Sequence, residues 1–260
     1  MKFDFRNHSV PVMARIVLLA ALSAPQLGLA QAAPVDEEAA AALKTMGDYI
    51  AGLRSLTFSA DTEAEIVLDN DQKLLMSGQV YYQATRPGHV AIELMTDVVR
   101  RELYYDGATV TYVAPDDGYY ATVEETGDIA TMLKTLAGAH ALAFPLADIF
   151  AWGTNDTPLD VIREGFFVGF ANIDGVATDH WAFRSADQDW EVWIQADGNP
   201  VPLQVSVVDK DVLARPRFTA RLKWDVESVP GPEVFTYSPA EGMSAVPLIT
   251  YEDADKEARQ

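Results

Sequence analysis

Alternation between apolar and polar residues runs through most of the chain after residue 55. From Leu56 to Leu68 every second residue is apolar or small, and the positions between them are mostly polar or acidic. This period of two predicts a long strand with one face in water. Similar runs meet at Asp106-Gly107 and Asp174-Gly175, which are typical hairpin turns. We therefore expect antiparallel strands over residues 56–68, 73–82, 89–95, 98–105, 109–114, 166–172, 176–184, 190–196, 203–208, 218–226 and 233–237.

Two segments instead repeat their apolar residues every three or four positions, which is the period of a helix. The first covers residues 35–53 with Asp36 as its expected N-cap, and the second covers residues 129–139 with Asp128 in that role. A short helical turn is expected over residues 145–150, because proline suits a first helical turn. The two apolar stripes consist of Leu43, Met46, Ile50 and Leu53, and of Ile129, Met132, Leu133 and Leu136.

These elements predict a mainly β fold of the α+β class. We expect an antiparallel half-open β-barrel of about ten or eleven strands, with two or three helices as a lid. A flat sheet of this size would leave costly edges, so meandering strands tend to curl. The helices can bury their apolar stripes on the concave side. No internal repeat or second domain boundary is visible, so we expect one domain over residues 33–250.

The two ends of the chain depart from this pattern. Residues 1–32 start with basic residues, continue with a short apolar run over residues 16–24 and end in Ala30-Gln31-Ala32. These features predict a signal peptide that is cleaved after Ala32, or alternatively after Ala33. A retained membrane anchor is the other interpretation, although the apolar run is short for a bilayer. Residues 251–260 form an acidic tail. We therefore expect a protein of the bacterial periplasm.

The composition of the chain excludes some kinds of site and disfavours some kinds of partner. The chain has no cysteine, which excludes disulfides and thiolate metal sites. Its formal net charge of −20 at pH 7 opposes binding to nucleic acid and to anionic membrane surfaces. Docking on a membrane would then need a basic partner protein or a local apolar patch. We expect a monomer without a cofactor, and we note that a high charge by itself indicates only solubility.

Several short sequence motifs resemble those of a known protein family. They are Arg86-Pro87, Tyr104-Tyr105-Asp106-Gly107, Pro145-Leu146-Ala147-Asp148, Asp179-His180-Trp181-Ala182-Phe183-Arg184, Asp189-Trp190-Glu191-Val192-Trp193-Ile194 and Phe235-Thr236-Tyr237-Ser238-Pro239. Together with the order of elements, they resemble an uncharacterised family of predicted periplasmic proteins that is similar in fold to the periplasmic carrier of outer-membrane lipoproteins (LolA-like). The resemblance implies a half-open barrel whose helices close an apolar cavity, which in the carrier takes acyl chains. No residue here can be matched to the arginine lid contact of that carrier, so no named site is transferred.

A lidded cavity predicts a binding or carrier protein for a hydrophobic ligand, such as a lipid or the acyl chains of a lipoprotein. Pockets favour apolar and aromatic walls, and methionines on two helix stripes suit an adaptable surface. Gly47 and Gly52 are the expected weak points of the first helix. The alternative is a sensor or protein-interaction module with a packed interior, in which the same side chains only fill the barrel. The predicted cavity-lining residues are Met46, Ile50, Phe58, Ile66, Met76, Leu94, Tyr105, Tyr112, Met132 and Leu136.

An enzyme is the least favoured interpretation. Asp179-His180 and the later Asp187 and Asp189 could bring a histidine and carboxylates together, as a hydrolase or a metal site requires. Turn chemistry and ordinary hydrogen bonding explain these residues more simply. The acidic turn 185–189 lacks the spacing of a calcium loop. Nucleophile-elbow, zinc-protease, phosphate-loop and dinucleotide motifs are absent from the sequence, so we predict no catalytic and no metal residues.

Overall fold

The computed structural model describes residues 35–154 and 159–250, which form one curved sheet with helices packed on one side. The expected signal peptide over residues 1–32 and the expected acidic tail over residues 251–260 lie outside the described residues. The predicted fold class, mainly β with helices over an open antiparallel sheet, is confirmed. The strands are β1 Ser55–Val67, β2 Lys73–Thr85, β3 His89–Thr96, β4 Arg100–Tyr105, β5 Thr109–Ala114, β6 Tyr119–Glu124, β7 Glu164–Ile173, β8 Val176–Arg184, β9 Gln188–Gln195, β10 Pro202–Asp209, β11 Arg217–Asp225 and β12 Ser244–Ala245.

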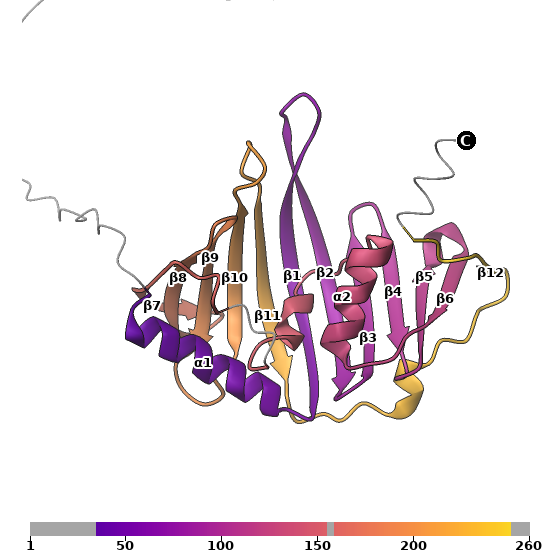
Figure 1. Cartoon of the computed structure of the whole chain (residues 1–260), viewed down its shortest axis with the longest axis horizontal. Coiled ribbons are helices and arrows are strands. Elements are labelled where there is room, and N and C mark those ends of the chain that lie inside the picture. The colour runs from indigo at the N-terminus through magenta and orange to yellow at the C-terminus, as the bar shows by residue number, and fades with distance from the viewer. Residues whose placement is uncertain (1–34, 155–158, 251–260) are drawn as a thin grey trace, which may run out of the picture. The chain divides into compact units, whose positions relative to one another are not determined.

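The sheet contains two meanders, β1–β6 and β7–β11, which meet at the long first strand. The sheet order is β12-β6-β5-β4-β3-β2-β1-β11-β10-β9-β8-β7, so β1 lies between β2 and the last long strand, β11 (Figure 1). Neighbouring strands are antiparallel, apart from the short β12, which runs parallel to β6. The strand pattern of the sequence explains the hairpins, since each turn joins strands that are adjacent in the sheet. The pairing of β1 with β11 is the long-range contact that joins the two meanders.

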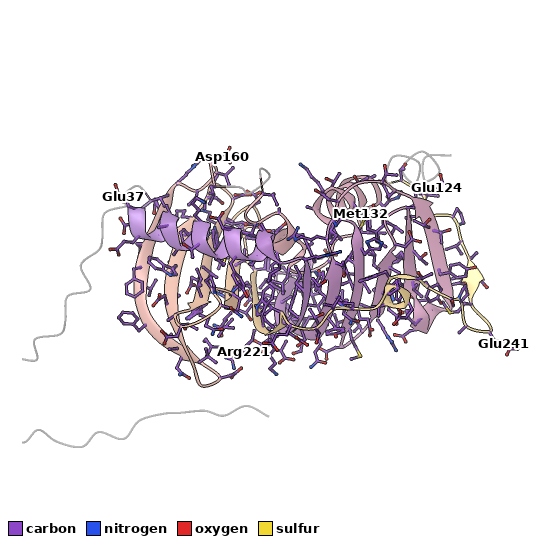
Figure 2. The ribbon with its side chains drawn as sticks, turned by 90° about the horizontal axis from the view of Figure 1, so that it is seen from below. Glu37, Glu124, Met132, Asp160, Arg221 and Glu241 are labelled. Carbon is purple, nitrogen blue, oxygen red and sulfur yellow. The ribbon has the colours of Figure 1, made fainter. Side chains whose placement is uncertain are left out.

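Both α-helices lie on the same side of the sheet, which we call the inner face. They are α1 Glu37–Gly52 and α2 Ile129–His140, accompanied by the 3-10 segments η1 Pro115–Asp117, η2 Ala147–Phe150 and η3 Pro232–Phe235. Figure 2 shows Glu37 on α1 and Met132 on α2 above the strands, with Arg221 on the opposite, outer face. Asp128 caps α2, because its side chain accepts a hydrogen bond of 2.8 Å from the backbone N–H of Thr131. Asp36 stands at the N-cap of α1 without such a bond.

An aromatic stack forms the centre of the core. Phe58 on β1 and Tyr82 on β2 face each other across the strands with ring centroids 4.6 Å apart, and both rings are buried. Phe150 of η2 lies against Tyr82 at 5.8 Å. The Tyr82 hydroxyl donates a 2.6 Å hydrogen bond to the carbonyl of Pro145, so its burial leaves no unsatisfied donor. The stack therefore connects the central strands to the segment that precedes η2.

Two strands of the sheet escaped the sequence prediction, and one predicted strand is wrong. The strand expected over residues 233–237 is the 3-10 segment η3, because Pro230 and Pro232 lack the N–H groups that a sheet ladder needs. The missed strand β6 has the period of two in its buried Ala121 and half-buried Val123. The missed β12 has only two residues and no pattern to read. Among the described residues, no helix is sufficiently long and apolar to cross a membrane.

Replacing Phe58 by alanine should destabilise the fold strongly. The change empties a site between Tyr82 and Trp224, whose ring centroid lies 4.8 Å from that of Phe58. We expect Phe58→Ala to lower the free energy of unfolding by about 3–5 kcal/mol, measured by urea denaturation. Leu213→Ala, at a side chain that is 99% exposed, is the matched control and should change it by less than about 0.5 kcal/mol. Similar losses in both variants would contradict the central role of the stack.

Candidate functional site

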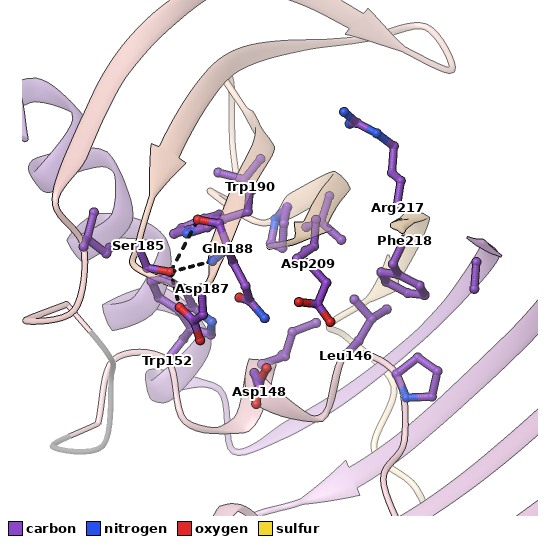
Figure 3. A pocket seen from close by; sticks show the side chains of 18 of the residues that line it. Leu146, Asp148, Trp152, Ser185, Asp187, Gln188, Trp190, Asp209, Arg217 and Phe218 are labelled. Carbon is purple, nitrogen blue, oxygen red and sulfur yellow. Dashed lines mark hydrogen bonds between the residues drawn. The ribbon is translucent and has the colours of Figure 1, made fainter. Parts of the chain in front are cut away.

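A cavity of about 660 Å³ opens on the inner face between α1, the segment around η2, the β8–β9 turn and strands β9–β11 and β1 (Figure 3). Its walls are mainly apolar, and its polar residues gather where the strands turn. Its lining consists of Met46, Ile50, Ala64, Glu65, Phe144, Pro145, Leu146, Asp148, Ile149, Trp152, Val161, Ile162, Ser185, Asp187, Gln188, Trp190, Val192, Pro202, Val205, Val207, Asp209, Pro216, Arg217 and Phe218.

The floor of the cavity follows from strand periodicity. Trp190 and Val192 alternate along β9, and Val205 and Val207 alternate along β10. The antiparallel register places Val192 opposite Val205 and Trp190 opposite Val207. Since residues opposite each other in a sheet share one face, all four side chains point to the inner face. Four apolar side chains from two strands thus form a continuous surface.

Residues 144–152, which we call the cover segment, close the cavity from above. Leu146 has φ of 66°, which turns the chain into η2. Trp152 then lies edge-on to Trp190, with the ring centroids 5.8 Å apart. The residue directly after the segment meets α1 backbone to backbone, because a Cβ atom added at Gly47 would lie 2.8 Å from the amide nitrogen of Gly153. Gly47 is therefore a close contact between helix and cover segment, a role that the sequence did not indicate.

A network of charges and hydroxyls fixes the turn between β8 and β9 at the edge of the cavity. Ser185 donates to the carboxylate of Asp187 and accepts a 3.1 Å hydrogen bond from the amide of Gln188. Asp189 pairs with Arg184 at 2.7 Å and with Lys210 at 3.0 Å. The hydrogen bond from Arg184, supported by Lys210, holds the pKa of Asp189 below its ordinary value. The network also ties the β8–β9 turn to the tip of the β10–β11 hairpin.

The structure distributes the ten predicted lining residues over several environments. Met46 and Ile50 line the cavity and are otherwise buried. Ile66, beyond the covered part of β1, is 43% exposed. Ile66 and the remaining seven residues do not line this cavity. Of those seven, Phe58, Tyr105, Met132 and Leu136 are buried in the packed core, whereas Met76, Leu94 and Tyr112 are half-buried.

Packing explains why α2 contributes nothing to the cavity. Its apolar stripe, including Met132 and Leu136, is fully buried against the strands of the first meander. Tyr105 is buried on that side too, and its hydroxyl donates a 2.9 Å hydrogen bond to the carbonyl of Gly127. The half of the inner face under α2 is therefore filled by protein, and the space remains on the α1 side.

Arg86 is a polar residue of the interior, which the sequence indicated only as part of the Arg86-Pro87 motif of the family resemblance. It follows β2, and its guanidinium carbon lies 5.8 Å from the centroid of the Phe150 ring. Its Nε and Nη2 atoms are buried without a hydrogen-bond partner in the described part of the chain. Burial lowers the pKa of Arg86, and the nearby Asp128 acts in the opposite direction. A cation thus lies at the junction of β2, η2 and the start of α2.

The residues considered for catalysis do not converge. His180 Nε2 lies 3.0 Å from a carboxylate oxygen of Glu191, and its ring stacks on Trp193 at 3.9 Å. Asp189 is engaged by Arg184 and Lys210 instead. Among the described residues, His180 and Asp189 are thus held by separate partners, and the convergence that the hydrolase interpretation requires is not observed. Within residues 35–154 and 159–250, no group of three or more His, Asp or Glu side chains could hold a metal ion.

Comparison with known proteins identifies the family. Residues 39–249 match the family described as "Predicted periplasmic protein (DUF2092)", and the chain belongs to this family. None of the curated protein sequences compared with the chain matches it.

Three solved structures illustrate the structural likeness. The lipoprotein LppX of Mycobacterium tuberculosis is 16% identical, with 75% of this chain and 98% of that chain aligned at a TM-score of 0.46. LprF of Mycobacterium bovis is 14% identical over 77% and 99% of the two chains, at 0.45. A LolA superfamily protein of Nitrosomonas europaea is 10% identical over 76% and 97%, at 0.34. With TM-scores below 0.5, these alignments carry no argument about function.

The ion pairs of Asp189 should make a pH-dependent contribution to stability. Because its pKa is depressed in the folded state, the contribution is present above the pKa of the unfolded chain, about 3.9, and is lost as the pH falls through the folded value. We expect Asp189→Asn to lower the free energy of unfolding at pH 7 by about 0.5–1 kcal/mol, and by progressively less below pH 4. Urea denaturation across this range measures the difference. A constant difference from pH 7 to pH 3 would contradict the assignment.

Proposed function

We propose that this member of the DUF2092 family binds a hydrophobic ligand, such as a lipid or the acyl part of a lipoprotein, in the cavity beneath α1 and the cover segment. The observation that carries the proposal is the cavity itself, about 660 Å³ in volume with mainly apolar walls. Sites for small organic molecules typically have volumes of about 300–1,000 Å³. Binding and later release, without any bond being made or broken, would constitute the function.

Burial of an acyl chain supplies enough free energy for such a role. Each methylene that leaves water contributes about 0.8 kcal/mol, so one long chain contributes roughly 8–12 kcal/mol before the costs of association. The side chains of Ile50, Val192 and Val205 offer the apolar contacts that this burial requires. A charged pocket is unnecessary for affinity, so polar groups at the edge can serve orientation or selection.

Release would require the cover segment to move relative to the strands. The segment is held by the hydrogen bond from Tyr82 to Pro145, by the ring contact between Trp152 and Trp190, and by the buried rings of Phe144 and Phe150. The cover segment nevertheless lines the cavity, whereas α2 contributes no residue to its lining. We therefore infer that the cover segment, rather than α2, opens to admit the ligand.

The periplasm is the compartment that we propose for this activity. The basic start, the short apolar run and Ala30-Gln31-Ala32 predict export, and the family is described as periplasmic. Lipids and acylated proteins that cross an aqueous compartment must have their chains shielded from water. A lidded cavity on a water-soluble surface provides that shielding.

Filling the cavity should abolish ligand binding while leaving the fold intact. Val207 lines the cavity, and its neighbour Val208 points to the other face of β10. We expect Val207→Trp to weaken binding of the uncharged probe N-phenyl-1-naphthylamine at least about tenfold, since the indole ring fills space that the apolar rings of the probe would occupy. Val208→Trp, the matched control, should bind like the wild type.

Fluorescence titration measures this binding, and native mass spectrometry of protein purified from a Gram-negative periplasm detects any co-purified lipid. Circular dichroism confirms that both variants are folded. A wild-type protein that carries no lipid and fails to take up the probe would refute the proposed function. Equal binding by both variants would place the ligand elsewhere.

A further inference from the structure

We propose that the ligand of this cavity is a cationic amphiphile, whose apolar chain lies on the floor and whose positively charged end lies at three carboxylates at the mouth. This inference rests on the proposed function and goes further, because it names the chemical class of the polar end. The carboxylates are those of Asp148, Asp187 and Asp209, which we call the rim. Figure 3 shows them around the cavity near Gln188.

The rim carries negative charge that the cavity itself does not balance. Arg217 is the one Lys or Arg residue in the lining, and Figure 3 shows its side chain directed away from the rim. Its guanidinium donates hydrogen bonds to the hydroxyl of Ser206 and to Glu191. Glu65, the fourth acid of the lining, is already paired with Lys73 at 2.8 Å. The lining therefore presents carboxylates to a ligand and keeps its guanidinium out of reach.

The three rim carboxylates differ in their internal partners. Asp187 accepts a hydrogen bond from Ser185, which together with the charge of Lys210 lowers its pKa and keeps it ionised. Lys210 itself is bonded to the carbonyl of Ser185 and to Asp189. Among the described residues, no Lys, Arg or His forms an ion pair with Asp148 or Asp209. Asp209 accepts a 2.8 Å hydrogen bond from the backbone N–H of Asp211, which leaves its negative charge without a cationic partner in the described part of the chain. These two acids are therefore the ones available to an external cation.

The surroundings favour an organic cation over a metal ion. The rim carboxylates are not grouped closely enough to hold a metal within the described residues. Trp152 and Trp190 line the same cavity, with their centroids 5.8 Å apart, and the face of an indole ring attracts a cation. A diffuse ammonium group attached to an apolar chain matches carboxylates above aromatic walls. An anionic end group would meet like charge at the mouth of the cavity.

The test compares three amphiphiles with the same twelve-carbon chain: dodecyltrimethylammonium, uncharged dodecyl maltoside and dodecanoate, each below its micellar concentration. Isothermal titration calorimetry of the mature protein should show the ammonium compound binding roughly tenfold more tightly than the maltoside. Dodecanoate should bind more weakly than the maltoside. The preference should shrink when salt is raised, because the mouth of the cavity is in contact with water.

Charge-matched variants separate the rim from the acidity of the whole chain. Asp148→Asn combined with Asp209→Asn should remove most of the ammonium preference, measured as the ratio of the dissociation constants of the maltoside and the ammonium compound in the same variant. The control combines Asp61→Asn with Asp97→Asn, two carboxylates outside the cavity lining, and changes the net charge equally. It should keep the preference.

The outcomes separate the inference about the charged end of the ligand from the proposed function on which it rests. Equal binding of all three amphiphiles would overturn the inference and leave the proposed function standing. Loss of the preference in both double variants would assign it to overall charge and overturn the role of the rim. If no amphiphile binds, the proposed function itself fails.

Discussion

One face of a curved sheet of 12 strands has to be shielded from water, and two short helices cannot cover all of it. The stack of Phe58 on Tyr82 is fully shielded from water, since η2 packs over it. On one side of the stack, α2 buries its whole apolar stripe. On the other side, α1 contributes Met46 and Ile50, and space remains between them and strands β9 and β10. The cavity is thus a consequence of one-sided burial with too little helix to complete it.

The connection between β6 and β7 determines how that space is closed. It supplies α2, whose apolar stripe is buried in the core, and the cover segment, which packs Phe150 into the core and lines the cavity. Tyr82 binds the carbonyl of Pro145, and Gly47 lets the chain at Gly153 approach α1 without a side chain between them. Arg86 lies near this region, and two of its buried nitrogen atoms have no hydrogen-bond partner among the described residues. The cover segment, rather than α2, is therefore the part of this connection that bounds the cavity.

Charged residues make the mouth of the cavity chemically different from its apolar floor. The chain is acidic throughout, with a formal net charge of −20, yet only some of its carboxylates border the cavity. Basic residues near the mouth are used in structural pairs, as Lys210 is with Asp189 and Arg217 is with Glu191. Within the described part of the chain, Asp148 and Asp209 at the opening form no ion pair. Apolar burial can thus supply affinity while the rim selects among chains with different end groups.

The sequence by itself determined the fold class and the two helices. The spacing of apolar residues, every two positions in strands and every three to four in helices, is a local property that does not depend on how the elements pack. The sequence also indicated Met46 and Ile50, since the stripe of α1 must face the sheet. It could not tell that Met132 and Leu136 would be sealed in the core while Val192 and Val205 would line a cavity, because all four have the same inward periodicity. Nor could it bring together Asp148, Asp187 and Asp209, which are separated along the chain. Only the tertiary structure decided these points, since the register of β9, β10 and β11 and the path of the cover segment set which side chains meet.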